Sequence, residues 1–123
     1  MGQRLPAPVL IVEDNHETRE VLERVLAVKG YSATTAADGL DALAYLRSGS
    51  TASVIILDLR MPNMDGYAFQ RALKADPRWA DIPVIIFSAF PPDDPGDAFA
   101  IVRKGNVDPD ALLSLIEQAA ARQ

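Results

Sequence analysis

Two short apolar segments, each ending in acidic residues, most constrain how this chain can fold. Residues 9–12 (Val-Leu-Ile-Val) lead into Glu13 and Asp14. Residues 54–57 (Val-Ile-Ile-Leu) lead into Asp58. Such uninterrupted aliphatic runs are typical of strands buried on both faces, and these strands belong to parallel sheets whose carboxyl ends bind ligands. The two segments therefore predict three carboxylates at one edge of a sheet.

Strand-like and helix-like segments alternate along the rest of the chain, which is typical of an α/β fold with a parallel sheet. Further strands are expected at 31–35, 84–87 and 100–103. Apolar residues at helical spacing predict a helix from about 21 that stops at Gly30, and another through 69–73 that ends at the break at 76–77, after turn residues at 62–66. Asp38 and Asp108 are predicted to cap two further helices, one ending near 49 and one at the end of the chain. The length fits one domain, residues 1–123.

One interval breaks this alternation. Residues 90–96 contain three prolines and two aspartates where a helix is expected between the fourth and fifth strands. Proline removes a backbone donor and clashes with the preceding helical turn. The sequence therefore predicts a loop there, or at most one short turn.

Composition narrows the classes of function. A net charge of −5 argues against non-specific binding of nucleic acid. The absence of cysteine excludes disulfides and thiolate metal sites and is compatible with a reducing compartment. Residues 1–5 lack the apolar segment of a signal peptide, and the longest apolar runs are only strand-length. We expect a cytoplasmic domain that binds neither nucleic acid nor membrane directly.

Polar residues also end the fourth and fifth expected strands, at Ser88 and Lys104. A doubly wound sheet brings these strand ends to the same edge as the acids. Three carboxylates repel one another unless a cation lies among them, and oxygen ligands favour Mg²⁺, which also binds phosphate oxygens. With Mg²⁺ and the ammonium of Lys104, the formal charges sum to zero. The pattern predicts a site that accepts a phosphoryl group.

Each of these residues alone has an ordinary explanation. An acidic pair after a strand often caps a helix, and a single Asp often forms a turn. Ser88 alone is a typical loop residue and Lys104 alone a typical surface charge. Their joint placement at successive strand ends favours a shared site. We interpret His16 as an ordinary helix or loop residue, and Trp79 and Phe99 as packing residues.

These segments resemble the receiver domain of response regulators over nearly the whole chain. Residues 9–15 resemble its first strand and acidic turn. Residues 57–66 (Leu-Asp-Leu-Arg-Met-Pro-Asn-Met-Asp-Gly) resemble its phosphoacceptor motif and the turn that follows. Residues 30–31 and 37–39 resemble the elements between them. The resemblance implies a doubly wound, five-stranded parallel sheet of flavodoxin-like order 2-1-3-4-5.

The resemblance also implies a role for each acidic residue. Asp58 would take a phosphoryl group from a histidine kinase or a histidine phosphotransfer protein. Glu13 and Asp14 would bind Mg²⁺ together with Asp58 and the backbone carbonyl of Arg60. The chain would then be a phosphoacceptor that assists its own phosphorylation and dephosphorylation rather than an enzyme, and it would act on an unknown downstream protein.

Two further roles follow from the same resemblance. Lys104 would pair with the phosphoryl oxygens, and the hydroxyl of Ser88 would hydrogen-bond to one of them after transfer. Arg60 and Phe90 would flank the phosphoryl position.

The chain departs from the family pattern between the fourth and fifth strands. The interval from Ser88 to Lys104 is shorter than is usual, so the helix expected there should be lost or reduced to a stub. Ile101 stands where the family commonly has an aromatic residue that moves during switching, and Gly105 replaces a usual proline. Our hypothesis is a phosphorylatable receiver with an unconventional readout, in which residues 90–96 replace the helix.

Three other functions are alternatives to that of a phosphorylatable receiver. The chief alternative is a receiver-like docking module that no longer uses phosphorylation. A phosphatase that forms an aspartyl-phosphate would need a second acid at the position of Arg60. A flavin-binding module would need a phosphate cradle after the first strand, where Glu13 and Asp14 are hostile to an unmetallated phosphate. Whether the chain acts alone or within a longer protein stays open.

Overall fold

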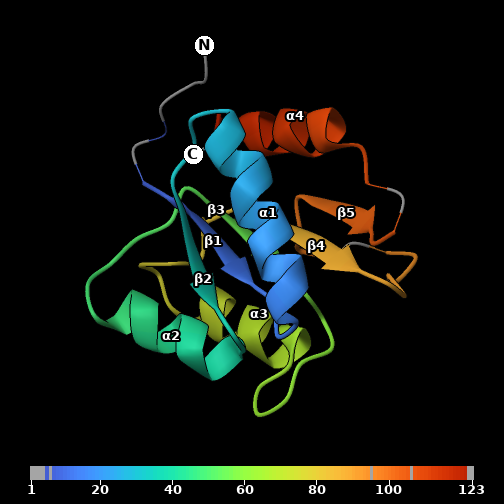
Figure 1. Cartoon of the computed structure of the whole chain (residues 1–123). Helices are drawn as coiled ribbons and strands as arrows, with labels where there is room; N and C mark the ends of the chain where they lie inside the picture. Colours follow the sequence, from blue (N-terminus) through green and yellow to red (C-terminus); the bar gives the residue numbers. More distant parts are fainter. Residues whose placement is uncertain (1–4, 6, 95, 106, 122–123) are drawn as a thin grey trace.

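The computed structural model describes residues 5, 7–94, 96–105 and 107–121, which contain a parallel sheet flanked by helices (Figure 1). The elements in chain order are β1 (Val9–Val12), α1 (His16–Val28), β2 (Ala33–Ala36), α2 (Gly39–Arg47), β3 (Val54–Leu57), α3 (Gly66–Ala75), β4 (Val84–Ser88), β5 (Ala100–Arg103) and α4 (Pro109–Ala120). The strand order β2-β1-β3-β4-β5, all parallel, confirms the predicted topology. The edge strand β2 begins two residues later than predicted.

The strand register explains why the polar residues gather at one edge. Val12 of β1 pairs with Leu57 of β3, so the acids that follow both strands leave the sheet side by side. The amide of Asp58 donates to the carbonyl of Val12 at 2.9 Å. At the same carboxyl edge, where β4 and β5 end, Lys104 donates its amide to the carbonyl of Ser88 at 2.9 Å.

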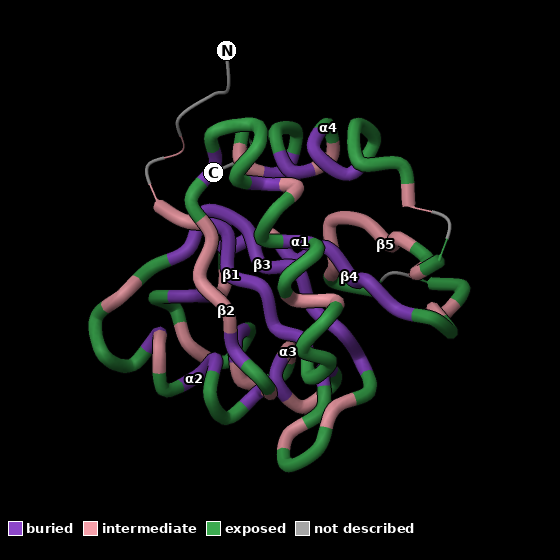
Figure 2. The backbone as a smooth tube through the Cα atoms, viewed as in Figure 1, coloured by how far each residue is buried: buried purple, intermediate pink, exposed green. Residues whose placement is uncertain are grey.

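Helices cover both faces of the sheet and bury its central strands (Figure 2). Helices α1 and α4 pack on one face, against Val9, Ile11 and Ile56 among others. Helices α2 and α3 pack on the other, where Phe69 and Leu73 of α3 lie in the core. Because both faces of the sheet are covered, every side chain of the central strands is buried. The strands β1 and β3 are therefore apolar throughout. None of the helices in the described ranges is long and apolar enough to cross a membrane.

The interval between β4 and β5 carries no helix in its described parts, residues 89–94 and 96–99. This confirms the predicted loss of a helix there; Pro95 of the predicted loop lies outside the described residues. The chain instead makes a turn in which the amide of Gly96 donates to Oδ1 of Asp94 at 2.9 Å. Ile101 of β5 is half-buried and packs against the cluster beneath α2 and α3.

The turn between β3 and α3 holds the backbone beside Asp58 in place. Asp65 caps α3 by accepting from the amide of Ala68 at 2.9 Å. The amide of Gly66 donates to the carbonyl of Leu59 at 3.0 Å. A Cβ atom at Gly66 would lie 2.5 Å from the carbonyl oxygen of Asp58, so only glycine permits this close approach.

We predict that Gly66→Ala destabilises the domain by about 2 kcal/mol, because the added methyl group overpacks the backbone of Asp58 and Leu59. Urea unfolding followed by the fluorescence of Trp79, the single and buried tryptophan, measures this. Arg71→Ala, an exposed change in the same helix, should stay within about 0.5 kcal/mol of the wild type. Equal effects of the two changes would show that the close approach is unimportant.

Candidate functional site

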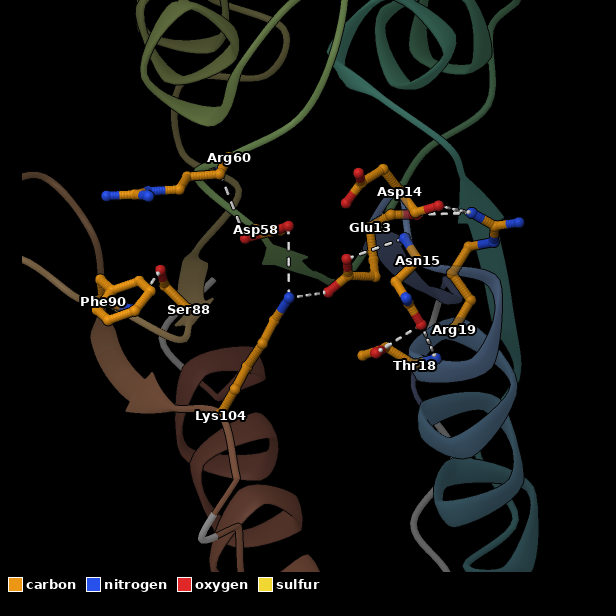
Figure 3. A network of polar contacts seen from close by, with 10 residues as sticks. All are labelled: Glu13, Asp14, Asn15, Thr18, Arg19, Asp58, Arg60, Ser88, Phe90 and Lys104. Carbon is orange, nitrogen blue, oxygen red and sulfur yellow. Dashed lines mark hydrogen bonds and ion pairs between the residues drawn. The ribbon is translucent and has the colours of Figure 1, made fainter.

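The carboxylates that follow β1 and β3 form a compact acidic cluster at the carboxyl edge of the sheet (Figure 3). One oxygen each from Glu13, Asp14 and Asp58 lies within 4.8 Å of the others. Glu13 and Asp58 are buried, whereas Asp14 is exposed. The structure thus brings together the three acids that the strand ends predicted.

Lys104 supplies a positive charge to this cluster from the end of β5. Its Nζ lies 2.5 Å from Oε1 of Glu13 and 3.4 Å from Oδ2 of Asp58. Partial burial acts to lower the pKa of the ammonium, but the hydrogen bonds and charges of the two carboxylates outweigh it and raise the pKa overall. The side chain therefore stays cationic and bridges two strands of the sheet.

Glu13 is the carboxylate of the cluster whose charged form is most disfavoured by burial. Burial raises its pKa to about 7, although Lys104 and the amide of Asn15 act in the opposite direction, and the charge of Asp58 adds to the rise. Oε2 accepts from the amide of Asn15 at 3.1 Å. Among the described residues, Oε1 has only its ion pair with Lys104. One ammonium does not balance three clustered carboxylates, so the donor set fits a divalent cation with oxygen ligands.

The remaining predicted residues lie beside Asp58 on the side away from Glu13 (Figure 3). The amide of Arg60 donates to Oδ1 of Asp58 at 3.3 Å. The hydroxyl of Ser88 is buried and accepts from the amide of Phe90 at 3.3 Å. In the described structure Ser88 therefore contacts its neighbour in the loop rather than the carboxylate of Asp58.

Two residues outside the predicted site, Arg19 and Asn15, support the acidic turn. Nη1 of Arg19 donates to the carbonyls of Glu13 at 2.8 Å and Asp14 at 3.1 Å. Asn15 caps α1 by accepting from the amide of Thr18 at 2.9 Å. The cap was readable as an Asn three residues before a Thr at a helix start. The role of Arg19 was not, because its contacts go to backbone carbonyls whose direction only the fold sets.

His16 takes the ordinary position that its sequence context indicated. It is the first residue of α1, and its exposed ring lies 2.8 Å from Oε1 of Glu20 one turn later. Trp79 is buried in the core beneath α2 and α3, and Phe99 packs against the opposite cluster. All three observations agree with the interpretation of these residues as structural.

Known proteins match this chain in sequence and in fold. The family model described as the response regulator receiver domain matches residues 9–108. Response regulator PleD of Caulobacter vibrioides is 36% identical over 104 residues, which are 85% of this chain and 22% of PleD. The chain spans 22–33% of the length of this and similar curated relatives, so it corresponds to one part of those proteins.

Two solved structures resemble the fold closely. The signal receiver domain of a signal transduction histidine kinase from Syntrophus aciditrophicus has a TM-score of 0.82 at 32% identity, covering 94% of this chain and 90% of that one. The response regulator TrrA of Thermotoga maritima, in complex with Mg²⁺–BeF, has a TM-score of 0.80 at 25% identity, covering 92% and 98%. With the sheet order and the match over residues 9–108, the chain belongs to the response-regulator receiver domains, which are signalling domains of two-component systems.

Proposed function

We propose that this receiver domain takes a phosphoryl group onto Asp58 from a phosphohistidine of a histidine kinase or histidine phosphotransfer protein. The placement of Asp58 carries the proposal. Its carboxylate is buried at the end of β3, with Oδ1 bonded to the amide of Arg60 and Oδ2 3.4 Å from the ammonium of Lys104. The carboxylate is thus oriented by one contact to each of its two oxygens.

The transfer step needs one nucleophile and stabilisation of negative charge. An oxygen of Asp58 bonds to phosphorus as the bond from phosphorus to the imidazole nitrogen breaks, and that nitrogen keeps the electron pair. The ammonium of Lys104 is close enough to pair with the phosphoryl oxygens. The hydroxyl of Ser88 is free to turn from the amide of Phe90 and donate to a phosphoryl oxygen.

We infer that Glu13, Asp14, Asp58 and the backbone carbonyl of Arg60 hold Mg²⁺. The support is the clustering of the three carboxylates and the raised pKa of the buried Glu13. The related TrrA was solved in complex with Mg²⁺–BeF, which supports Mg²⁺ as the cation here. Bound Mg²⁺ neutralises charge on the transferring group. The protein residues orient the acceptor oxygen and keep the cluster compact.

A second function, a docking module that does not use phosphorylation, is favoured by two observations. The β4–β5 interval carries no helix in its described residues, and Ile101 has no ring or hydroxyl with which to report a change at Asp58. The acidic cluster and its lysine argue against this function, because a pure docking surface has no need of a buried, unbalanced carboxylate such as Glu13.

We predict that incubation with Mg²⁺ and acetyl phosphate adds the mass of one phosphoryl group to the wild type, as measured by intact mass spectrometry. Asp58→Asn should give no adduct, because an amide oxygen is a poor nucleophile. Asp81→Asn removes an exposed acid outside the cluster and should react like the wild type. An unmodified wild type would support the docking module instead.

Asp14→Asn should weaken Mg²⁺ binding at least about tenfold, because it removes a carboxylate from the proposed ligands. Isothermal titration with MgCl₂ measures the affinity. Asp14 is exposed, so the variant should fold normally, and Asp81→Asn provides a control of equal charge. Equal affinities for the two variants would mean that Mg²⁺ binds elsewhere or only as a diffuse counter-ion.

Lys104→Met should strengthen Mg²⁺ binding by about tenfold in the absence of a phosphoryl group. The ammonium lies 2.5 Å from Glu13 and 3.4 Å from Asp58, so it competes with the cation for the same charges. The same titration tests this. Weaker binding by the variant would show that Lys104 orders the carboxylates for the metal rather than competing with it.

A further inference from the structure

Arg60 and Phe90 form a contact at the mouth of the site that neither metal binding nor phosphoryl transfer uses. The guanidinium carbon of Arg60 lies 5.1 Å from the centre of the Phe90 ring, which is cation–π geometry. The ring is 68% exposed, so apolar burial does not hold it in place. Figure 3 shows both side chains beside Asp58, on the side away from Glu13 and Asp14.

This contact is the middle link of a chain of weak interactions that runs from Asp58 to Ser88. The amide of Arg60 donates to Asp58, the guanidinium of Arg60 covers Phe90, and the amide of Phe90 donates to Ser88. Both hydrogen bonds are 3.3 Å long, beyond the usual range for N–H···O bonds. Each link is therefore easily exchanged for a stronger partner.

A phosphoryl group on Asp58 would be such a partner. It adds nearly two negative charges and three acceptor oxygens to a residue that stands two positions before Arg60 in the chain. An arginine pairs with a phosphoryl group through two parallel charged hydrogen bonds, whereas an exposed cation–π contact is among the weaker interactions of a charged side chain. The balance between the two contacts should therefore reverse when Asp58 is phosphorylated.

We propose that Arg60 binds the phosphoryl group on Asp58. Its guanidinium moves from the ring of Phe90 to the phosphoryl oxygens, and the ring of Phe90 is thereby released. The proposal rests on the function proposed for Asp58. Phe90 begins the segment between β4 and β5 that carries no helix in its described residues, and its amide also bonds Ser88. Phosphorylation thus loosens both the contact of Phe90 with Arg60 and the hydrogen bond of Phe90 with Ser88. The exposed ring of Phe90 then signals the state of Asp58, a role that Ile101 cannot fill.

The test measures the affinity for beryllofluoride, a phosphoryl mimic, at saturating Mg²⁺. Arg60→Met keeps the backbone carbonyl and most of the aliphatic stem but removes the charged guanidinium, and it should weaken binding about tenfold. Phe90→Leu removes the competing ring and should strengthen binding about two- to fivefold. In the Arg60→Met background, Phe90→Leu should have no effect. Tyr67→Leu, a change at another exposed ring on α3, should match the wild type.

A second readout follows the ring itself. In the wild type, saturation with beryllofluoride should move the aromatic resonances of Phe90 to those seen in free Arg60→Met. The proposal is overturned if these resonances do not move, or if Phe90→Leu weakens binding or acts equally in both backgrounds. If the wild type binds no beryllofluoride at all, the function proposed for Asp58 fails, and this inference fails with it.

Discussion

The bridge from Lys104 to Glu13 and Asp58 is the interaction on which the rest of the site depends. It joins the edge strand β5 to the two central strands β1 and β3, across a cluster of acids that would otherwise repel one another. The charge of Lys104 does not fully compensate the burial of Glu13, because the pKa of Glu13 is still raised to about 7. In the function that we propose, this residual imbalance favours the uptake of a cation, which allows the site to accept an anionic phosphoryl group.

The sheet makes this arrangement possible by register rather than by local sequence. The pairing of Val12 with Leu57 sets Glu13 and Asp58 beside each other, and the close approach of Gly66 fixes the turn that follows Asp58. The strand pairing joins segments more than forty residues apart in the chain. A shift of one residue in either strand would exchange its side chains between the two faces of the sheet and separate the acids.

Much of the fold could be predicted because its signals are local. The runs at 9–12 and 54–57 gave both central strands, and capping residues such as Asp38 and Asp108 marked helix starts correctly. The edge strand β2 was placed less well, because one of its faces is partly exposed and its pattern is weak. The contacts of Arg19 with backbone carbonyls and the contact of Arg60 with Phe90 were beyond prediction, since they join loops whose directions depend on the whole fold.

The chemistry of the site and its readout are separable in this molecule. The acids and the lysine meet at the sheet edge, while the described residues between β4 and β5 form a turn at Asp94 where a helix would complete the alternation of strands and helices. If Asp58 is phosphorylated as we propose, the signal has a short route to the surface through Ser88 and Phe90, which share a hydrogen bond. The route does not require the half-buried Ile101 to move.

Amide spectra of the wild type with and without Mg²⁺ and beryllofluoride test the central claim most directly. The account predicts large shifts at Asp58, Arg60 and Lys104 that continue through Phe90 into residues 93–94 and 96–99, with small shifts in α2. Shifts confined to the metal-binding residues, with none in the segment between β4 and β5, would contradict it.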